Sequence, residues 1–95
     1  MVIRSFKDED VELFFLEGDR PRKKGWVSIL KIVQRKLDML HYAKELKDLL
    51  SPPGNNLEGL EGNLEGWYSI RINDQWRILF RWDSQPYDVH IMDYH

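Results

Sequence analysis

The first half of the chain alternates apolar and polar positions with a helical period. A short helix is predicted to begin after Asp8, whose side chain can cap it, and to end at Gly18. Apolar residues then recur at helical spacing from Trp26 to Leu40, which predicts an amphipathic helix of about four turns. The leucines that follow leave this stripe, so we expect a break near Ala43 and a short second piece ahead of a proline-rich turn.

The period changes to two in the second half of the chain. Three runs alternate apolar and polar residues, as strands with one buried face do: 68–72, 76–82 and 87–91. A short apolar stretch at 2–6 is a further candidate strand. Helices first and strands afterwards favour an α+β fold, in which the N-terminal helices pack on one face of a small antiparallel sheet. The length favours a single domain over residues 1–95.

The alternation also predicts how the strands pair, because a slip of one residue would expose the buried set. Pairing Ile72 with Trp76 places Arg71 directly opposite Arg77 on the polar face. Two opposed arginines cost stability unless an anion lies between them. A phosphate would be the functional answer, and a carboxylate such as Glu58 or Glu61 the structural one. The pairs expected between the second and third strands are Trp82–Tyr87, Phe80–Val89, Ile78–Ile91 and Arg77–Met92.

Composition and charge narrow the class of protein. A chain with 42% hydrophobic and 32% charged residues folds, and the absence of cysteine excludes disulfides and thiolate metal sites. No apolar run is long enough for a membrane span, and the N-terminus lacks the apolar stretch of a signal peptide, so a cytoplasmic protein is expected. The net charge of -2 conceals a basic stripe with no acidic residue, which either attracts a phosphate backbone or is a solvated helix face. The basic stripe comprises Arg20, Arg22, Lys23, Lys24, Lys31, Arg35 and Lys36.

Two segments carry a resemblance to a known family: the run from Tyr68 to Trp82 and the terminal Asp93-Tyr94-His95. With 3–6 and 51–63 they resemble the HigB-type toxins of the RelE/ParE superfamily, over most of the chain. The resemblance implies the toxin of a type II toxin–antitoxin pair, a ribosome-dependent endoribonuclease that cleaves mRNA in the A site. It also implies a HigA-type helix-turn-helix antitoxin as partner, in an arrangement such as a heterotetramer of two toxins and two antitoxins. No membrane partner and no cofactor are implied.

The implied reaction is a metal-independent attack of an RNA 2′-hydroxyl on its adjacent phosphate. It needs a base, positive charge beside the phosphorane and an acid for the leaving group. Arg77 matches the family's strand arginine, and Arg71 is its expected helper. The family's terminal catalytic residues correspond to Asp93, Tyr94 and His95, and a histidine titrates near neutral pH. Glu58 stands where some relatives have a catalytic histidine, so it is a further candidate for the base. Three scattered histidines without matching carboxylates argue against a metal site.

Further residues are candidates for binding RNA. Trp67 opposite Arg81 suggests stacking, which serves either a nucleobase or the covering of the sheet. The full set of expected RNA-binding residues is Arg71, Arg81, Trp67, His90, Arg22, Lys23, Lys24, Lys31 and Arg35. The loop with Glu61 and Glu65 is acidic where relatives often carry Lys or Arg. This departure supports an alternative function, a catalytically weak RelE-fold protein retained for antitoxin or ribosome binding.

Overall fold

The computed structural model describes residues 3–22 and 24–93. In chain order, its helices are α1 (Glu9–Glu17), the 3₁₀ helix η1 (Gly25–Ile29), α2 (Leu30–Tyr42) and the short 3₁₀ helices η2 (Leu46–Leu50), η3 (Pro53–Asn55) and η4 (Gly62–Leu64). Its strands are β1 (Glu58–Gly59), β2 (Tyr68–Arg71), β3 (Trp76–Trp82) and β4 (Pro86–Asp93).

The helix boundaries follow the capping residues. The Asp8 carboxylate accepts a hydrogen bond from the Asp10 backbone N–H at 2.9 Å, and Gly18 ends α1 with a left-handed φ of 77°. The predicted break near Ala43 is confirmed, since that residue is extended directly after α2. The predicted helix from Trp26 differs at its start, which is a 3₁₀ turn rather than an α-helix. In that turn a Cβ added to Gly25 would overlap the Trp76 ring, so glycine allows the close approach.

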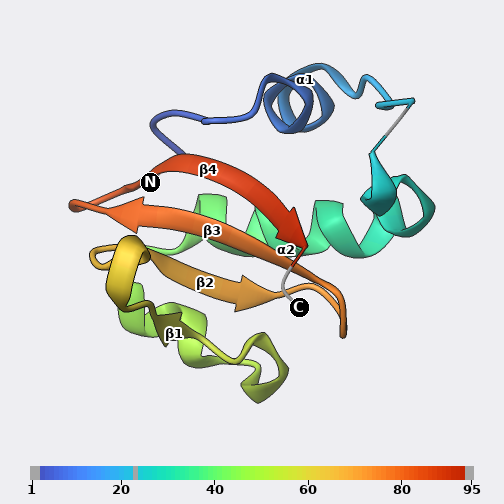
Figure 1. Cartoon of the computed structure of the whole chain (residues 1–95). Coiled ribbons are helices and arrows are strands. Elements are labelled where there is room, and N and C mark those ends of the chain that lie inside the picture. Colours follow the sequence, from blue (N-terminus) through green and yellow to red (C-terminus); the bar gives the residue numbers. More distant parts are fainter. Residues whose placement is uncertain (1–2, 23, 94–95) are drawn as a thin grey trace.

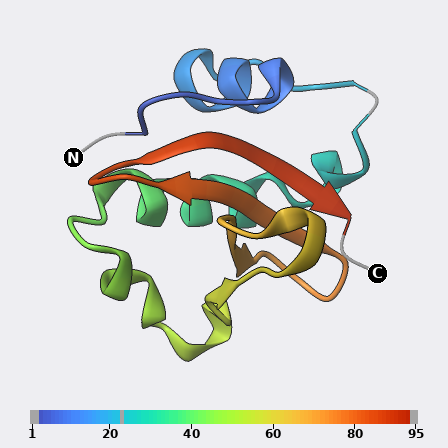
Figure 2. The same cartoon turned by 60° about the vertical axis from the view of Figure 1, so that its left-hand side comes forward.

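The strands form an antiparallel sheet in the order β1-β2-β3-β4 (Figure 1). Helix α2 runs across one face of the sheet, and α1 lies beyond the β4 edge (Figure 1). Figure 2 shows the turned view, in which α2 and the η4 turn lie on opposite sides of the sheet. The predicted α+β fold, in which N-terminal helices pack against a small antiparallel sheet, is therefore confirmed.

The segment before α1 runs along the outer edge of β4. Arg4 N–H donates to Pro86 O at 2.8 Å, and Lys7 N–H donates to Val89 O at 2.9 Å. Among the described residues of the expected strand at 2–6, the pairing with β4 amounts to one parallel bridge, between Phe6 and Val89. Residue 2 lies outside the described residues. The segment thus covers the edge of β4, which protects the backbone groups there.

The predicted register of β2 and β3 is confirmed. Ile70 pairs with Ile78, and Arg71 lies opposite Arg77. The alternation was sufficient here because the buried face admits one register. Strand β1, a two-residue pairing at the edge of β2, was not predicted.

The predicted register of β3 and β4 is correct at one end and wrong at the other. Ile78 pairs with Ile91 and Arg77 with Met92, as expected. Beyond Leu79 the register shifts, so that Arg81 pairs with Tyr87 and Trp82 with Pro86. The expected Trp82–Tyr87 pair is therefore absent, and Phe80–Val89 is not among the paired residues. The cause is a bulge, in which Asp88 takes a left-handed φ of 52°.

The core lies between α2 and the sheet. Two of the buried polar residues, Lys36 and Asn55, matter for the site. Val33, Leu37 and Leu40 of α2 are fully buried with the apolar face of the sheet. Lys36 is also buried, and its ammonium donates to Asn55 Oδ1 at 2.5 Å. Burial is the main cause that lowers the pKa of Lys36, and the charges of Arg35 and Arg71 add to it. Lys36 is therefore an internal anchor for the 51–56 turn and not an exposed member of the basic stripe.

Candidate functional site

Arg77 is a buried arginine at the start of β3. Its side chain is 7% exposed, and its Nε donates to Ser69 Oγ at 2.8 Å. Its Nη2 donates to the Asn56 carbonyl at 2.6 Å, while Glu58 Oε1 lies 3.8 Å away. These contacts come from β1, β2 and the turn that Lys36 anchors. The plane of the guanidinium is thus fixed by groups from separate segments of the chain.

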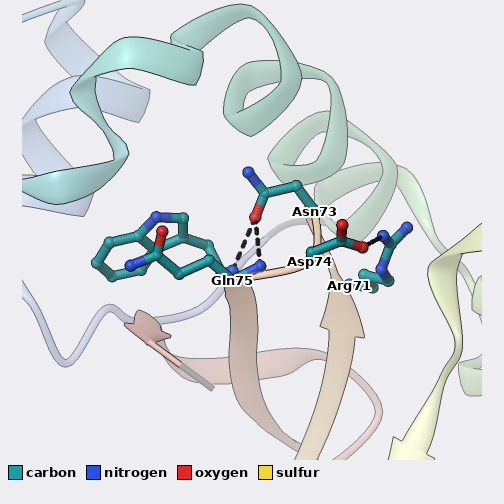
Figure 3. A network of polar contacts seen from close by, with 5 residues as sticks. Arg71, Asn73, Asp74 and Gln75 are labelled. Carbon is teal, nitrogen blue, oxygen red and sulfur yellow. Dashed lines mark hydrogen bonds and ion pairs between the residues drawn. The ribbon is translucent and has the colours of Figure 1, made fainter. Parts of the chain in front are cut away.

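Arg71 lies opposite Arg77 in the register, but its side chain turns toward a different carboxylate. It forms an ion pair with Asp74 in the β2–β3 turn (Figure 3). Asn73 shapes this turn, because its side-chain oxygen accepts from the backbone N–H of Gln75 at 2.9 Å and of Trp76 at 2.8 Å (Figure 3).

Each of the two opposed arginines therefore has a carboxylate beside it in the structure. Glu58, one of the two expected carboxylates, lies near Arg77, while the carboxylate on Arg71 comes from Asp74. Asp74 is 98% exposed, so its pair with Arg71 contributes at most about 1 kcal/mol to stability. Glu58 is 48% exposed, which leaves its carboxylate accessible from solvent.

Asp93, at the end of β4, lies beside the start of β3. It pairs with Trp76, the residue before Arg77, and its Oδ2 accepts from Gln75 Nε2 at 3.0 Å. Tyr94 and His95 lie outside the described residues. The structure thus gathers Arg71, Arg77, Glu58 and Asp93 around the start of β3.

Trp67, Arg81 and His90 gather at the other end of the same sheet face. The Arg81 guanidinium lies 5.7 Å from the Trp67 ring centroid, which confirms the expected contact between these two residues. His90 is diagonal to Arg77 as expected, since it pairs with Leu79, but its ring lies edge-on to Trp67 at 5.2 Å. Arg81 lies four positions after Arg77 on β3, a distance of about 13 Å.

The pKa of His90 is lowered, and burial of the ring is the largest cause of this shift. The positive charge of Lys7 lowers it further, while the hydrogen bond with the Asp88 carbonyl and the charges of Asp8 and Asp88 oppose the shift. His90 therefore favours the neutral form in the folded protein.

The exposed cations of the basic stripe on α2 lie away from both groups. Lys31 and Arg35 are exposed on α2, which covers the face of the sheet opposite to Arg77. Arg22 is exposed between α1 and η1, and Lys24 pairs with Asp10 at 3.3 Å and with Asp8 at 3.8 Å. Lys23 lies outside the described residues. The structure does not bring these cations to the Arg77 end of the sheet.

Sequence reasoning did not single out Ser69 and Asn56, although both accept hydrogen bonds from Arg77. Ser69 was within reach of prediction, because the expected register places it diagonal to Arg77 on the same face. Asn56 contacts Arg77 through its backbone carbonyl, which leaves no signal in the residue type.

Within the described ranges, no helix is both long and apolar enough to cross a membrane.

A four-stranded antiparallel sheet with α2 on one face and two opposed arginines on the other is consistent with a small α+β protein of the RelE-like toxin type. The chain belongs to the HigB-like toxin family: the model of the RelE-like toxin of type II toxin–antitoxin system HigB matches residues 4–95. It is 47% identical over 77 residues to Toxin HigB-1 of Vibrio cholerae serotype O1, covering 81% of this chain and 80% of that protein. It is also 34% identical over 90 residues to an uncharacterized protein of Haemophilus influenzae, covering 95% and 88% of the two chains. As a type II toxin, it has a cognate antitoxin as its partner.

Proposed function

We propose that this toxin is a ribosome-dependent endoribonuclease that cleaves mRNA in the A site by attack of a 2′-hydroxyl on the adjacent phosphate. The observation that carries the proposal is the fixed guanidinium of Arg77, held by Ser69 and the Asn56 carbonyl. Negative charge grows on the phosphate oxygens as the attack proceeds. A cation that is already oriented stabilises this charge without reorganisation, which is where such groups contribute most.

Proton transfer in this proposal falls to His95 and Glu58. A histidine titrates near neutral pH, so His95 can donate a proton to the 5′-oxygen that leaves as the P–O5′ bond breaks. The Glu58 carboxylate, 3.8 Å from the Arg77 guanidinium, is within reach of a phosphate bound there and can accept the proton of the 2′-hydroxyl. Asp93 pairs with Trp76, the residue before Arg77. Tyr94 is proposed to stack or donate a hydrogen bond, with Arg71 supporting Arg77. The mechanism requires no metal ion.

The proposed partners follow from the same function. We propose a HigA-type helix-turn-helix antitoxin, in a complex of two toxins and two antitoxins, and the ribosome with its mRNA, all in the cytoplasm. The chain acts as a single domain in this proposal. The exposed cations Arg22, Lys31 and Arg35 are proposed to contact ribosomal RNA or an acidic surface of the antitoxin.

A second function is favoured by a specific observation. The Arg77 guanidinium already has a carboxylate beside it, and Glu61 and Glu65 are exposed in the following loop. Negative charges there repel an mRNA phosphate, which suits a catalytically weak protein retained for antitoxin or ribosome binding. Glu58→Gln separates the two functions. It lowers cleavage if Glu58 is the base and raises cleavage if Glu58 merely competes for Arg77.

The test is inducible expression of the chain alone in a bacterium, with growth followed and mRNA 5′ ends mapped within minutes. We expect growth arrest and new cuts inside translated codons, both lost in His95→Ala. Tyr42→Ala is the matched control, because Tyr42 is 71% exposed at the end of α2, on the other side of the molecule from Arg77. If cells that contain abundant, folded protein grow normally and their messages stay intact, the binding function explains the protein better than the nuclease function.

A further inference from the structure

Three cations surround two aromatic rings at the end of the sheet away from Arg77. The Arg4 guanidinium lies 4.4 Å from the Tyr87 ring centroid, and Arg81 lies 5.4 Å from Tyr87 and 5.7 Å from Trp67. The Lys7 ammonium lies 5.3 Å from the Trp67 ring centroid. All three cationic side chains are exposed, while both rings are half-buried. We call these five residues the cation–aromatic surface.

Distant segments of the chain build this surface. Arg81 and Tyr87 are direct partners across β3 and β4, a pairing that exists only because of the bulge at Asp88. The hydrogen bonds of Arg4 and Lys7 to the edge of β4 bring their side chains to the same rings. His90, edge-on to Trp67, supports that ring from the side. The rings are thus held by the sheet, whereas the cations are attached by long, exposed side chains.

The chemistry of the surface selects one class of ligand. Half-buried rings on a rigid sheet offer faces on which nucleobases stack, and exposed cations beside them neutralise the phosphates between the bases. Cation–π contacts at exposed sites are weak, so a base can displace a cation from a ring face. The displaced cation then pairs with the adjacent phosphate. The Asp88 carboxylate beside Tyr87 accepts a hydrogen bond from the Ser5 hydroxyl at 3.4 Å.

We propose that Arg4, Lys7, Trp67, Arg81 and Tyr87 form a stacking site for single-stranded RNA, which holds nucleotides outside the step that is cleaved. The inference rests on the proposed nuclease function for the direction of the RNA along the sheet. The surface lies about 13 Å from Arg77 along β3, which corresponds to at most about four nucleotides at the 3.4 Å spacing of a stacked strand. A message bound at both places is held across the face of the sheet.

The experiment compares two RNAs, both blocked against cleavage by 2′-O-methyl groups. One is a trinucleotide and the other extends it on both sides. Binding to the purified chain is measured by fluorescence anisotropy. We expect the extended RNA to bind at least about tenfold more tightly than the trinucleotide. Tyr87→Ser and Trp67→Ser lose this gain, whereas Tyr87→Phe and Trp67→Phe keep it. Tyr42→Ser, a change at an exposed tyrosine elsewhere, keeps it as well.

The salt dependence of binding separates the cations from the rings. Lys7→Gln and Arg81→Gln each reduce the slope of log Kd against log salt by about 0.7, the value for one phosphate contact on a single strand. Lys47→Gln is the matched control, because Lys47 is 72% exposed on η2 and the slope is expected to stay unchanged. Lys7 is exposed, so its substitution leaves the fold intact. The test can therefore be made even if substitution of a half-buried ring disturbs folding.

The outcomes distinguish this inference from the proposed function. Equal binding of the two RNAs by the wild-type chain, or no binding, overturns the stacking site even if mRNA is cleaved on ribosomes. A wild-type chain that cleaves nothing on ribosomes but keeps the length-dependent gain supports the stacking site and removes the nuclease function. An acidic peptide that displaces the RNA and binds more tightly overturns the inference in favour of protein docking.

Discussion

The two ends of one sheet face hold their cations in opposite ways. Arg77 is 7% exposed and bound by Ser69 and the Asn56 carbonyl, whereas Arg81 is exposed and lies over the Trp67 and Tyr87 rings. Charge stabilisation in a transition state requires an oriented group, because reorganisation at that moment adds to the barrier. Binding of a flexible single strand tolerates mobile cations over rigid rings. Burial, rather than the presence of an arginine, therefore separates the proposed catalytic end from the proposed binding end.

The largest expected effect is that of Arg77→Ala. Cleavage on ribosomes programmed with mRNA should fall by about 10²–10³-fold in single-turnover measurements, the usual loss for one oriented donor. Unfolding in urea should show a loss of about 1–3 kcal/mol, because the Ser69 hydroxyl and Asn56 carbonyl lose their donor. Arg81→Gln serves as the comparison and should change RNA affinity with no such loss of stability. Undiminished cleavage in a folded Arg77→Ala protein would remove the distinction between the two ends.

The bulge in β4 gives the next largest effect. Asp88 has a φ of 52°, which costs a β-branched residue about 1–2 kcal/mol more than Asn or Gly. We expect Asp88→Val to lower the free energy of unfolding by roughly that amount relative to Asp88→Asn. The same substitution should abolish the RNA-length effect at the cation–aromatic surface while leaving the Arg77 end in register. Equal stability of the Val and Asn variants would show that the bulge is not the constraint.

Ser69→Ala tests how far the orientation of Arg77 depends on one contact. The Ser69 hydroxyl accepts from Arg77 Nε at 2.8 Å and is fully buried. Its removal should lower kcat by about fivefold, the equivalent of about 1 kcal/mol for one hydrogen bond, with KM unchanged. The kcat of Ser69→Cys, which retains a weak acceptor, should lie between that of the wild-type protein and that of Ser69→Ala. A rise in KM without a change in kcat would assign Ser69 to substrate binding instead.

The smallest expected effect is the pH dependence contributed by His90. Its folded pKa is lowered, mainly by burial, so its contribution to stability is fully present above the unfolded value of 6.5 and is lost as pH falls through the folded pKa. His90→Gln should therefore reduce the difference in urea midpoint between about pH 7.5 and about pH 5. The corresponding control is His41→Gln. A difference unchanged by His90→Gln would assign the acid sensitivity to other groups.

Prediction from sequence succeeded where a local repeat carried the information. Alternation placed Arg71 opposite Arg77, and capping residues placed both ends of α1. It failed where a residue depends on a distant partner. Lys36 looks like an exposed cation of an amphipathic helix, yet it is buried and its ammonium donates a hydrogen bond to Asn55 Oδ1. The pairing of Arg77 with Glu58 was one of two alternatives that the sequence left open, because the position of β1 depends on the turn that Lys36 anchors.

The α+β class, the polar face of the sheet and the family can all be read from the amino-acid sequence. They follow from periodicities of 3.6 and 2 and from motifs, which are properties of neighbouring residues. The place where β4 bulges and the rings that the N-terminal cations reach depend instead on the folded structure. Ser5 and Asp88 are 83 residues apart but exchange hydrogen bonds at 2.9 and 3.4 Å, and that contact lies beside the left-handed turn of β4. Contacts of this kind depend on how separate elements pack, and no local pattern encodes them.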